Sequence, residues 1–354
     1  MDWFAERLLR WAKVHGRKNL PWQQDSTPYH VWVSEIMLQQ TQVKSVINYY
    51  ERFIKRFPTL SDLANASEHE VLQQWSGLGY YRRARNLHKC AQTIRDEHHG
   101  KFPDSLEILK KLPGIGASTA GAILSLGFNS RGTIMDGNVR RVLARIHGIT
   151  EPVNQSSTER KLWDLAQSHT PHSRHAEYAQ AIMDFGATWC TKHDPMCSEC
   201  TMQTECIAFR IKKVQDLPFS LKRSRPREEN LDLLLITDSL GFVLLEQRPP
   251  EGLWSSLWLP PHKSKKTPIE SLLQGFGLPY NDQIVSHELE KFEHTLSHIK
   301  FTVSADVLKL GVKHTELAPN PRIRWCNADN IQDLAVPALT NKLIAAVNSK
   351  ANLS

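Results

Sequence analysis

The sequence predicts a multidomain protein, with an all-α region at residues 1–210, a basic linker at 211–227 and an α+β domain at 228–354. Two observations predict this division. Apolar residues recur at helical spacing up to about residue 210, whereas beyond it they form short runs bounded by turn residues, as in strands. The length of 354 residues allows two or three domains with real cores. A composition of 40% hydrophobic and 23% charged residues excludes a disordered polymer.

The helical region opens with an amphipathic segment at 1–10, in which apolar residues are expected on one face of a helix and charged residues on the other. Helix starts are predicted at 58–62 and 103–105, where small polar residues follow a proline. The apolar stretch 119–128 is about half as long as a membrane span, and no signal peptide is visible. We therefore expect a cytoplasmic, nucleoid-associated bacterial protein with Cys90 and Cys326 as buried thiols.

The second domain is predicted from short apolar runs. A hairpin is expected at 238–241, where Asp-Ser-Leu-Gly separates two of these runs. The expected strands are 231–236, 242–245, 301–310 and 323–325, and a closing helix is expected at 337–347.

The net charge of +7 is unevenly distributed between the two regions. Residues 226–354 hold 13 Lys and Arg against 15 Asp and Glu, whereas residues 1–225 hold 31 against 22. An excess of nine positive charges on the helical region suits a polyanion such as nucleic acid, although solubility alone explains it equally well.

Four of the six cysteines, Cys190, Cys197, Cys200 and Cys206, lie within 17 residues in the spacing C-x6-C-x2-C-x5-C. A structural zinc ribbon normally uses two C-x2-C pairs, and only one is present here. Four thiolates from one compact loop suit a cubane iron–sulfur cluster, so this interpretation is preferred over zinc and over coincidence.

A second motif is the segment Leu112-Pro-Gly114-Ile-Gly116, which follows two lysines and precedes a helix that contains Ser118. Two glycines two residues apart allow a tight turn whose free N–H groups face one phosphate. The pattern predicts a helix-hairpin-helix that holds a nucleic-acid backbone without reading bases. The alternative is a plain turn between helices.

Two carboxylates are candidate catalytic residues. Glu35 lies among apolar residues on a predicted helix, so burial would keep it protonated and able to donate a proton; otherwise it is a solvated helix face. Asp136 directly precedes another helix, where an aspartate is most often an N-cap.

Taken together, these motifs resemble those of the MutY-type adenine DNA glycosylases, in the endonuclease III superfamily. The resemblance covers nearly the whole chain and rests on segments in the same order: 34–42 (SEIMLQQTQ), 75–86 (WSGLGYYRRARN), the hairpin, 136–139 (DGNV) and the cysteine run. It implies a base-excision-repair enzyme that acts on double-stranded DNA, flips adenine out of mispairs with 8-oxoguanine or guanine, and carries one [4Fe-4S] cluster on its four clustered cysteines. A monomer is expected.

The resemblance also assigns roles within the helical region. Glu35 matches the acid that protonates the leaving adenine, and Asp136 matches the carboxylate that stabilises the cationic sugar, either electrostatically or through a covalent bond. The remaining matches are Trp22 and Gln180 near the adenine pocket, Gln39, Gln40 and Tyr80 as wedges in the DNA stack, and the hairpin residues Leu112, Gly114, Gly116 and Ser118 on the DNA backbone.

Ser118 separates two subclasses of the superfamily. Members with lyase activity carry a lysine at this position, whose amine forms a Schiff base with the sugar, and a serine cannot form an imine. We therefore predict a monofunctional glycosylase that leaves an abasic site in an uncut strand. The alternatives are a bifunctional glycosylase and lyase and a non-catalytic damage-binding protein.

The second domain resembles the Nudix-like domain of the same family. A hydrolytic Nudix domain would carry a Gly…Arg-Glu-x-x-Glu-Glu box, and none is present, which argues against a fourth candidate, a Nudix phosphohydrolase. The domain is expected to recognise 8-oxoguanine through Leu296, Ser297 and His298. Leu296 stands where the family usually has an aromatic residue.

Overall fold

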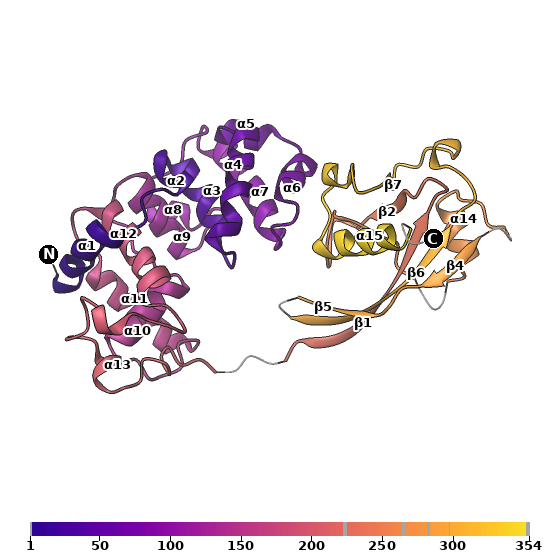
Figure 1. The fold of residues 1–354 in the computed structure, drawn as a ribbon. Coiled ribbons are helices and arrows are strands. Elements are labelled where there is room, and N and C mark those ends of the chain that lie inside the picture. The colour runs from indigo at the N-terminus through magenta and orange to yellow at the C-terminus, as the bar shows by residue number, and fades with distance from the viewer. Residues whose placement is uncertain (1, 222–224, 264–266, 282–283, 297, 352–354) are drawn as a thin grey trace. The chain divides into compact units, whose positions relative to one another are not determined.

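A computed structural model describes residues 2–221, 225–263, 267–281, 284–296 and 298–351 (Figure 1). Backbone contacts divide the chain into two compact units, Met1–Ser67 with Arg82–Lys222 and Glu68–Tyr81 with Arg223–Ser354. Among the described residues, no helix is both long and apolar enough to cross a membrane. Each unit is described separately below.

The first unit is built from helices, as the spacing of apolar residues predicts. The predicted start near residue 58 is confirmed, because the Thr59 hydroxyl accepts the backbone N–H of Asp62 in a capping box. Its helices are α1 (Trp3–His15), α2 (Pro21–Gln24), α3 (Pro28–Leu38), α4 (Val43–Arg56), α5 (Leu60–Asn65), α7 (Arg82–Glu97), α8 (Leu106–Leu109), α9 (Ala117–Ala122), α10 (Gly137–Ile146), α11 (Ser156–His169), α12 (His175–Asp184) and α13 (Ile207–Arg210).

One apolar core joins α1, α10, α11 and α12. The apolar face of α1 supplies Phe4, Leu8 and Leu9, all nearly inaccessible to solvent, whereas Trp3 remains 37% exposed. The amphipathic pattern of residues 1–10 therefore predicts the packing correctly at three of its four apolar positions. Cys90 is also buried, as expected.

Two glycines allow the loop before α10 to pass directly against α9. A Cβ atom on Gly121 would lie 1.9 Å from the carbonyl oxygen of Thr133, and one on Gly132 would lie 2.1 Å from the carbonyl oxygen of Gly121. Only glycine fits at either position. This close approach fixes the segment that leads to Asp136.

The second unit contains a mixed sheet, with one parallel pair (β1 and β6) and antiparallel neighbours. The predicted hairpin is confirmed: the Asp238 carboxylate accepts the backbone N–H groups of Leu240 and Phe242, and Gly241 has φ +84°. The unit comprises α6 (Glu68–Trp75), β1 (Arg227–Thr237), β2 (Val243–Gln247), β3 (Trp258–Leu259), α14 (Ile269–Gly275), β4 (Val285–Glu288), β5 (Phe292–Thr295), β6 (Ile299–Lys309), β7 (Ile323–Cys326) and α15 (Ala338–Ala351).

Both faces of this sheet are covered. Alternate residues of β1 and β6 face an apolar cluster that includes Leu339 and Leu343 of α15, and the opposite residues face a cluster that includes Leu273 of α14. The closing helix and the strands at 231–236, 242–245, 301–310 and 323–325 occur as predicted. β3, β4, β5 and α14 were not predicted, because they are short and none of them contains a long apolar run.

The segment expected to be a linker is partly folded. Leu217 is buried, the backbone N–H of Val153 donates to the carbonyl of Phe219 (2.8 Å), and the backbone N–H of Leu221 donates to the Asn154 side chain (3.1 Å). Residues 217–221 are therefore fixed on the helical unit. Toward its other end, the expected linker overlaps the first residue of β1, Arg227.

Candidate active site

A pocket in the helical unit brings together residues that are far apart in the sequence. Glu35 from the middle of α3, Trp22 from α2 and Gln180 from α12 all line it. Its volume of about 50 Å³ holds water but no purine, so a base can enter only if the walls move apart. The other lining residues are Arg17, Leu20, Gln23, Ser26, Val31, Ser34, Leu38, Val43, Leu126 and Met183.

Glu35 lies on a largely apolar helix, α3. Thr27 caps α3 by accepting the backbone N–H of His30, and Pro28 occupies the first turn, where its missing N–H costs nothing. Burial and, to a lesser extent, the negative charge of Asp136 raise the pKa of the Glu35 carboxyl to about 7. The side chain therefore holds its proton near neutral pH while its carboxyl reaches the pocket.

Asp136 is the N-cap of α10. One of its carboxylate oxygens accepts the backbone N–H groups of Asn138 (2.9 Å) and Val139 (2.8 Å), and the other accepts the Asn138 side-chain amide (3.2 Å). These hydrogen bonds confirm that Asp136 is an N-cap, as considered from the sequence. It is compatible with an electrostatic role, because the fixed carboxylate is near enough to Glu35 to raise its pKa.

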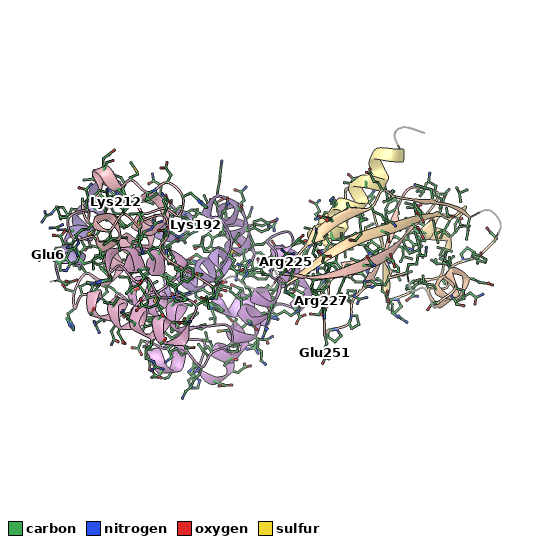
Figure 2. The ribbon with its side chains drawn as sticks, turned by 90° about the horizontal axis from the view of Figure 1, so that it is seen from below. Glu6, Lys192, Lys212, Arg225, Arg227 and Glu251 are labelled. Atoms are coloured by element: carbon green, nitrogen blue, oxygen red, sulfur yellow. The ribbon has the colours of Figure 1, made fainter. Side chains whose placement is uncertain are left out.

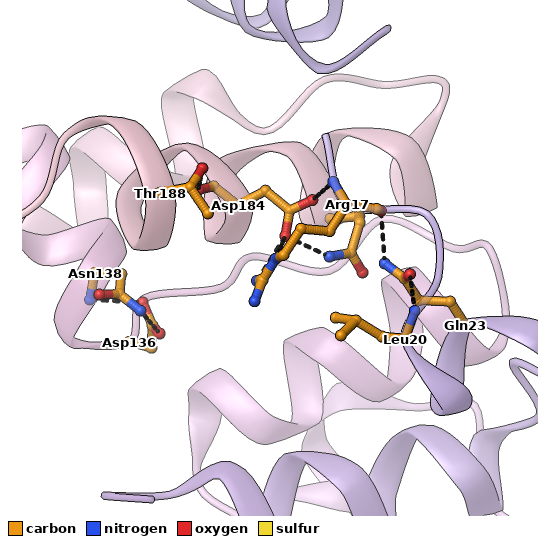
Figure 3. A network of polar contacts seen from close by, with 8 residues as sticks. Arg17, Leu20, Gln23, Asp136, Asn138, Asp184 and Thr188 are labelled. Atoms are coloured by element: carbon orange, nitrogen blue, oxygen red, sulfur yellow. Dashed lines mark hydrogen bonds and ion pairs between the residues drawn. The ribbon is translucent and has the colours of Figure 1, made fainter. Parts of the chain in front are cut away.

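Gln180 belongs to a polar network that the sequence did not predict. Figure 3 shows two other members of this network, Arg17 and Asp184. The Gln180 amide donates to the carboxylate of Asp184 (2.8 Å), which is fully buried. The same carboxylate accepts the side-chain Nε (2.7 Å) and the backbone N–H (2.8 Å) of Arg17. The one clue in the sequence was an aspartate inside the apolar run 181–185. The network fixes the orientation of Gln180 toward the pocket.

Trp22 is buried and makes an edge contact with Tyr50 of α4, with ring centroids 5.5 Å apart. Aromatic pairs at this distance and angle favour one ring orientation. Trp22 is therefore a fixed apolar wall of the pocket.

The expected wedge residues have unusual backbones. Gln40 (φ +57°) and Tyr80 (φ +50°) both adopt the left-handed conformation that side chains disfavour, and Tyr80 is 49% exposed. Gln39 makes a long contact from its amide to the Thr119 hydroxyl (3.5 Å). Arg83 holds the end of α3 by donating to the carbonyls of Ile36 and Met37 (both 2.9 Å).

The helix-hairpin-helix segment joins α8 to α9. Gly114 has φ +77°, and a Cβ there would lie 2.8 Å from Cβ of Asn86, so the turn requires glycine. Leu112 is buried, and the space beside Gly116 is open. Ser118 has a structural partner, because its hydroxyl accepts the backbone N–H of Met135 (3.1 Å), next to Asp136.

The four clustered cysteines converge on one region of the helical unit. Burial and, to a lesser extent, the nearby Cys190, Cys206 and Cys197 raise the pKa of the Cys200 thiol to about 12. The Arg145 guanidinium donates to the Cys190 sulfur (3.4 Å), and the backbone N–H of Met202 donates to the Cys200 sulfur (3.4 Å). Over the described part of the chain, no three His, Cys, Asp or Glu side chains are grouped to hold a single metal ion. Lys192 and Lys212, which lie close to these cysteines in the sequence, are exposed, and Figure 2 labels both on the helical unit.

In the second unit, the expected recognition residues lie between β5 and β6. Leu296 packs against the apolar cluster under α15, and its backbone N–H donates to the carbonyl of Ile299 (2.8 Å). His298 is exposed, and its carbonyl accepts the backbone N–H of Arg227 (3.0 Å). Ser297 lies outside the described residues.

Comparison with known proteins shows the same two parts. Residues 33–168 match the model of the HhH-GPD superfamily base excision DNA repair proteins, and residues 233–346 match that of the NUDIX domain. The chain is 37% identical over 345 residues to an adenine DNA glycosylase of Buchnera aphidicola subsp. Baizongia pistaciae, covering 97% of this chain and 96% of that protein. It is 33% identical to the human adenine DNA glycosylase, covering 96% of this chain and 73% of the human protein.

Solved structures resemble part of the chain. The structure of a thermostable thymine-DNA glycosylase aligns with a TM-score of 0.54 at 25% identity, covering 59% of this chain and 95% of that one. A non-covalent endonuclease III–DNA complex aligns with a TM-score of 0.50 at 20% identity, which shows a shared fold.

Proposed function

The chain belongs to the MutY-type adenine DNA glycosylase family of base excision repair, and we propose that it excises adenine opposite 8-oxoguanine, or guanine, by acid-assisted hydrolysis that leaves an abasic site. The observation that carries this proposal is Glu35, a carboxyl whose pKa is raised to about 7 in the pocket shared with Trp22 and Gln180.

The reaction starts with a flipped base. Adenine cannot be reached inside a duplex, so it is rotated into the pocket at a cost of a few kcal/mol. Gln39, Gln40 and Tyr80 fill or distort the vacated stack, and the hairpin residues Leu112, Gly114, Gly116 and Ser118 hold the DNA backbone. The strained backbones of Gln40 and Tyr80 support this assignment.

Glu35 then donates its proton to a ring nitrogen of adenine as the N-glycosidic bond breaks, and the bonding electrons leave with the neutral base. Positive charge develops on the sugar, and the Asp136 carboxylate stabilises it. The Glu35 carboxylate next accepts a proton from the water that attacks the sugar. The acid is thereby restored, and adenine and an abasic site are the products.

Ser118 restricts the reaction to base removal. Its hydroxyl accepts a hydrogen bond from Met135 and offers no amine for a Schiff base. The direct test is incubation with duplexes that contain A:8-oxoG, A:G or A:T, analysed with and without alkali. We expect strand cleavage only after alkali, and most strongly for A:8-oxoG. Direct nicking, or equal excision from A:T, would refute the proposal.

We propose that Cys190, Cys197, Cys200 and Cys206 hold one [4Fe-4S] cluster. Four partly buried cysteines lie on one loop, and their thiolates would need the positive charge of a bound metal group. A cubane spreads its four ligands more widely than a single zinc ion does. When bound, the cluster supplies structural cross-linking and a redox-capable centre. Iron analysis and visible absorption test this assignment: a colourless, zinc-containing protein would contradict it.

We propose that the chain consists of a helical catalytic region at 1–210, a linker at 211–227 and a recognition domain at 228–354. We also propose that this last domain recognises the base opposite adenine through Leu296, Ser297 and His298. Hydroxyl and imidazole groups suit the N7–H and carbonyl of 8-oxoguanine, which guanine presents differently. Its near-neutral charge supports contact with one base rather than with a long stretch of backbone. We propose a monomer, which light scattering during size-exclusion chromatography tests.

A further inference from the structure

Arg145, in the last turn of α10, is a charged residue to which the reaction above gives no role. Its exposed fraction is 1%, among the lowest of any charged side chain in the described residues. A guanidinium keeps its charge in proteins, so this charge is buried permanently.

The side chain joins two segments that are separated in the sequence. On one side its two terminal nitrogens donate to the Cys190 sulfur (3.4 Å) and to the carbonyls of Thr191 (2.6 Å) and Lys192 (3.1 Å). On the other side its Nε donates to the carbonyl of Leu217 (2.9 Å). Arg145 therefore ties the start of the cysteine loop to the segment through which the chain leaves the helical unit.

The charge of Arg145 has no conventional partner. Within the described residues no carboxylate forms an ion pair with it, and a buried cation without a counter-charge is strongly unfavourable. Among its contacts, the group that becomes an anion when it ligates iron is the sulfur of Cys190. A cluster bound by four thiolates carries net negative charge and would supply the missing balance.

We propose that Arg145 is a positioning residue with two functions: it is the counter-charge that retains the iron–sulfur cluster, and it is the latch that holds residues 217–221 on the helical unit. This inference rests on the cluster proposed above. The latch continues along the chain, because Phe219 and Leu221 bond to Val153 and Asn154 directly after the Leu217 contact.

Two substitutions separate the two functions. Arg145→Met fills similar space without charge or donors, whereas Arg145→Lys keeps the charge but lacks the planar fork that reaches both segments. Arg160→Met, which changes an exposed residue of α11, is the control for removing an arginine from this unit. The full-length proteins are compared for iron content, cluster reduction potential and tryptic cleavage after Arg210, Lys212 and Lys213, which are exposed and precede Leu217.

We expect Arg145→Met to weaken cluster retention about 10- to 100-fold, as is usual for groups that support metal ligands, and to be cut faster after Lys213. Arg145→Lys should keep its iron but be cut faster than the wild type, and Arg160→Met should match the wild type. Circular dichroism identifies a variant that has failed to fold, and Arg145→Lys then decides the question.

Two results would overturn the inference. If Arg145→Met has the iron content, cluster reduction potential and tryptic cleavage rate of the wild type, Arg145 neither balances the charge of the cluster nor holds residues 217–221 on the helical unit. If Arg145→Lys loses iron as completely as Arg145→Met, charge is not what retains the cluster. A wild-type protein without iron would refute the proposed cluster and, with it, this inference. A wild-type protein that contains iron, combined with either of the two results above, would refute only the role of Arg145.

Discussion

Replacement of Glu35 by glutamine should abolish excision and, at the same time, stabilise the protein in a pH-dependent manner. In the unfolded chain this carboxyl titrates near 4.5, whereas in the folded protein its pKa is about 7. Glutamine resembles the protonated form and cannot ionise, so the variant isolates the free energy that ionisation of Glu35 costs the fold.

The sign and size follow from proton linkage. Between pH 4.5 and 7 the folded protein holds a proton that the unfolded chain has released, so the free energy of unfolding falls as the pH rises through this range. At about 1.4 kcal/mol per pKa unit, the full difference is about 3 kcal/mol. Glu35→Gln and the wild type should therefore be equally stable near pH 4.5, and the variant should be more stable by about 3 kcal/mol above pH 7.

Urea unfolding at several pH values, followed by far-ultraviolet circular dichroism, measures this difference. Exposed Glu97 at the end of α7 gives a matched control, and Glu97→Gln should show no such dependence on pH. Single-turnover excision should fall about 10²- to 10⁴-fold in Glu35→Gln, the usual contribution of a general acid. A stability difference that is constant with pH would show that Glu35 is not a buried acid with a raised pKa. A variant that still excises adenine would show that Glu35 is not the proton donor.

Three further changes test other parts of the site. Ser118→Lys places an amine beside the sugar, so we expect nicking without alkali and trapping by borohydride, and an uncut strand would contradict this placement of the hairpin helix. Gly121→Ala puts a Cβ against the Thr133 carbonyl and should destabilise the fold by about 1–3 kcal/mol in urea unfolding, whereas Gly275→Ala, with open space around it, should have little effect. His298→Ala should reduce the preference for A:8-oxoG over A:G up to about tenfold, the worth of one hydrogen bond, without slowing A:G excision; an unchanged preference would exclude His298 from recognition.

The sequence identifies those features that depend on local chemistry. The capping box at Thr59 and the turn at Asp238 were recognisable because their partners lie within four residues. Glu35 was recognisable because most of its neighbours on the helix are apolar. Local chemistry says nothing about Arg17 and Asp184, which are 167 residues apart and meet only because the turn after α1 packs on α12. The close approach of Gly121 to Thr133 is hidden for the same reason: a glycine in a helix looks like a weak helix former until the neighbouring loop is known.

The two carboxylates of the site differ in what surrounds them, and this difference separates their roles. Asp136 accepts three N–H groups at the start of α10, donors that suit an anion in a fixed position. Glu35 lies on a helix whose neighbours are apolar, and the nearby charge of Asp136 adds to the effect of burial in keeping it protonated near neutral pH. Removing the Asp136 charge would therefore take away both the stabilisation of the sugar cation and part of what keeps the acid protonated. The structure thus predicts that the two carboxylates act as a coupled pair, so the loss of activity in the double variant should be much smaller than the product of the two single losses.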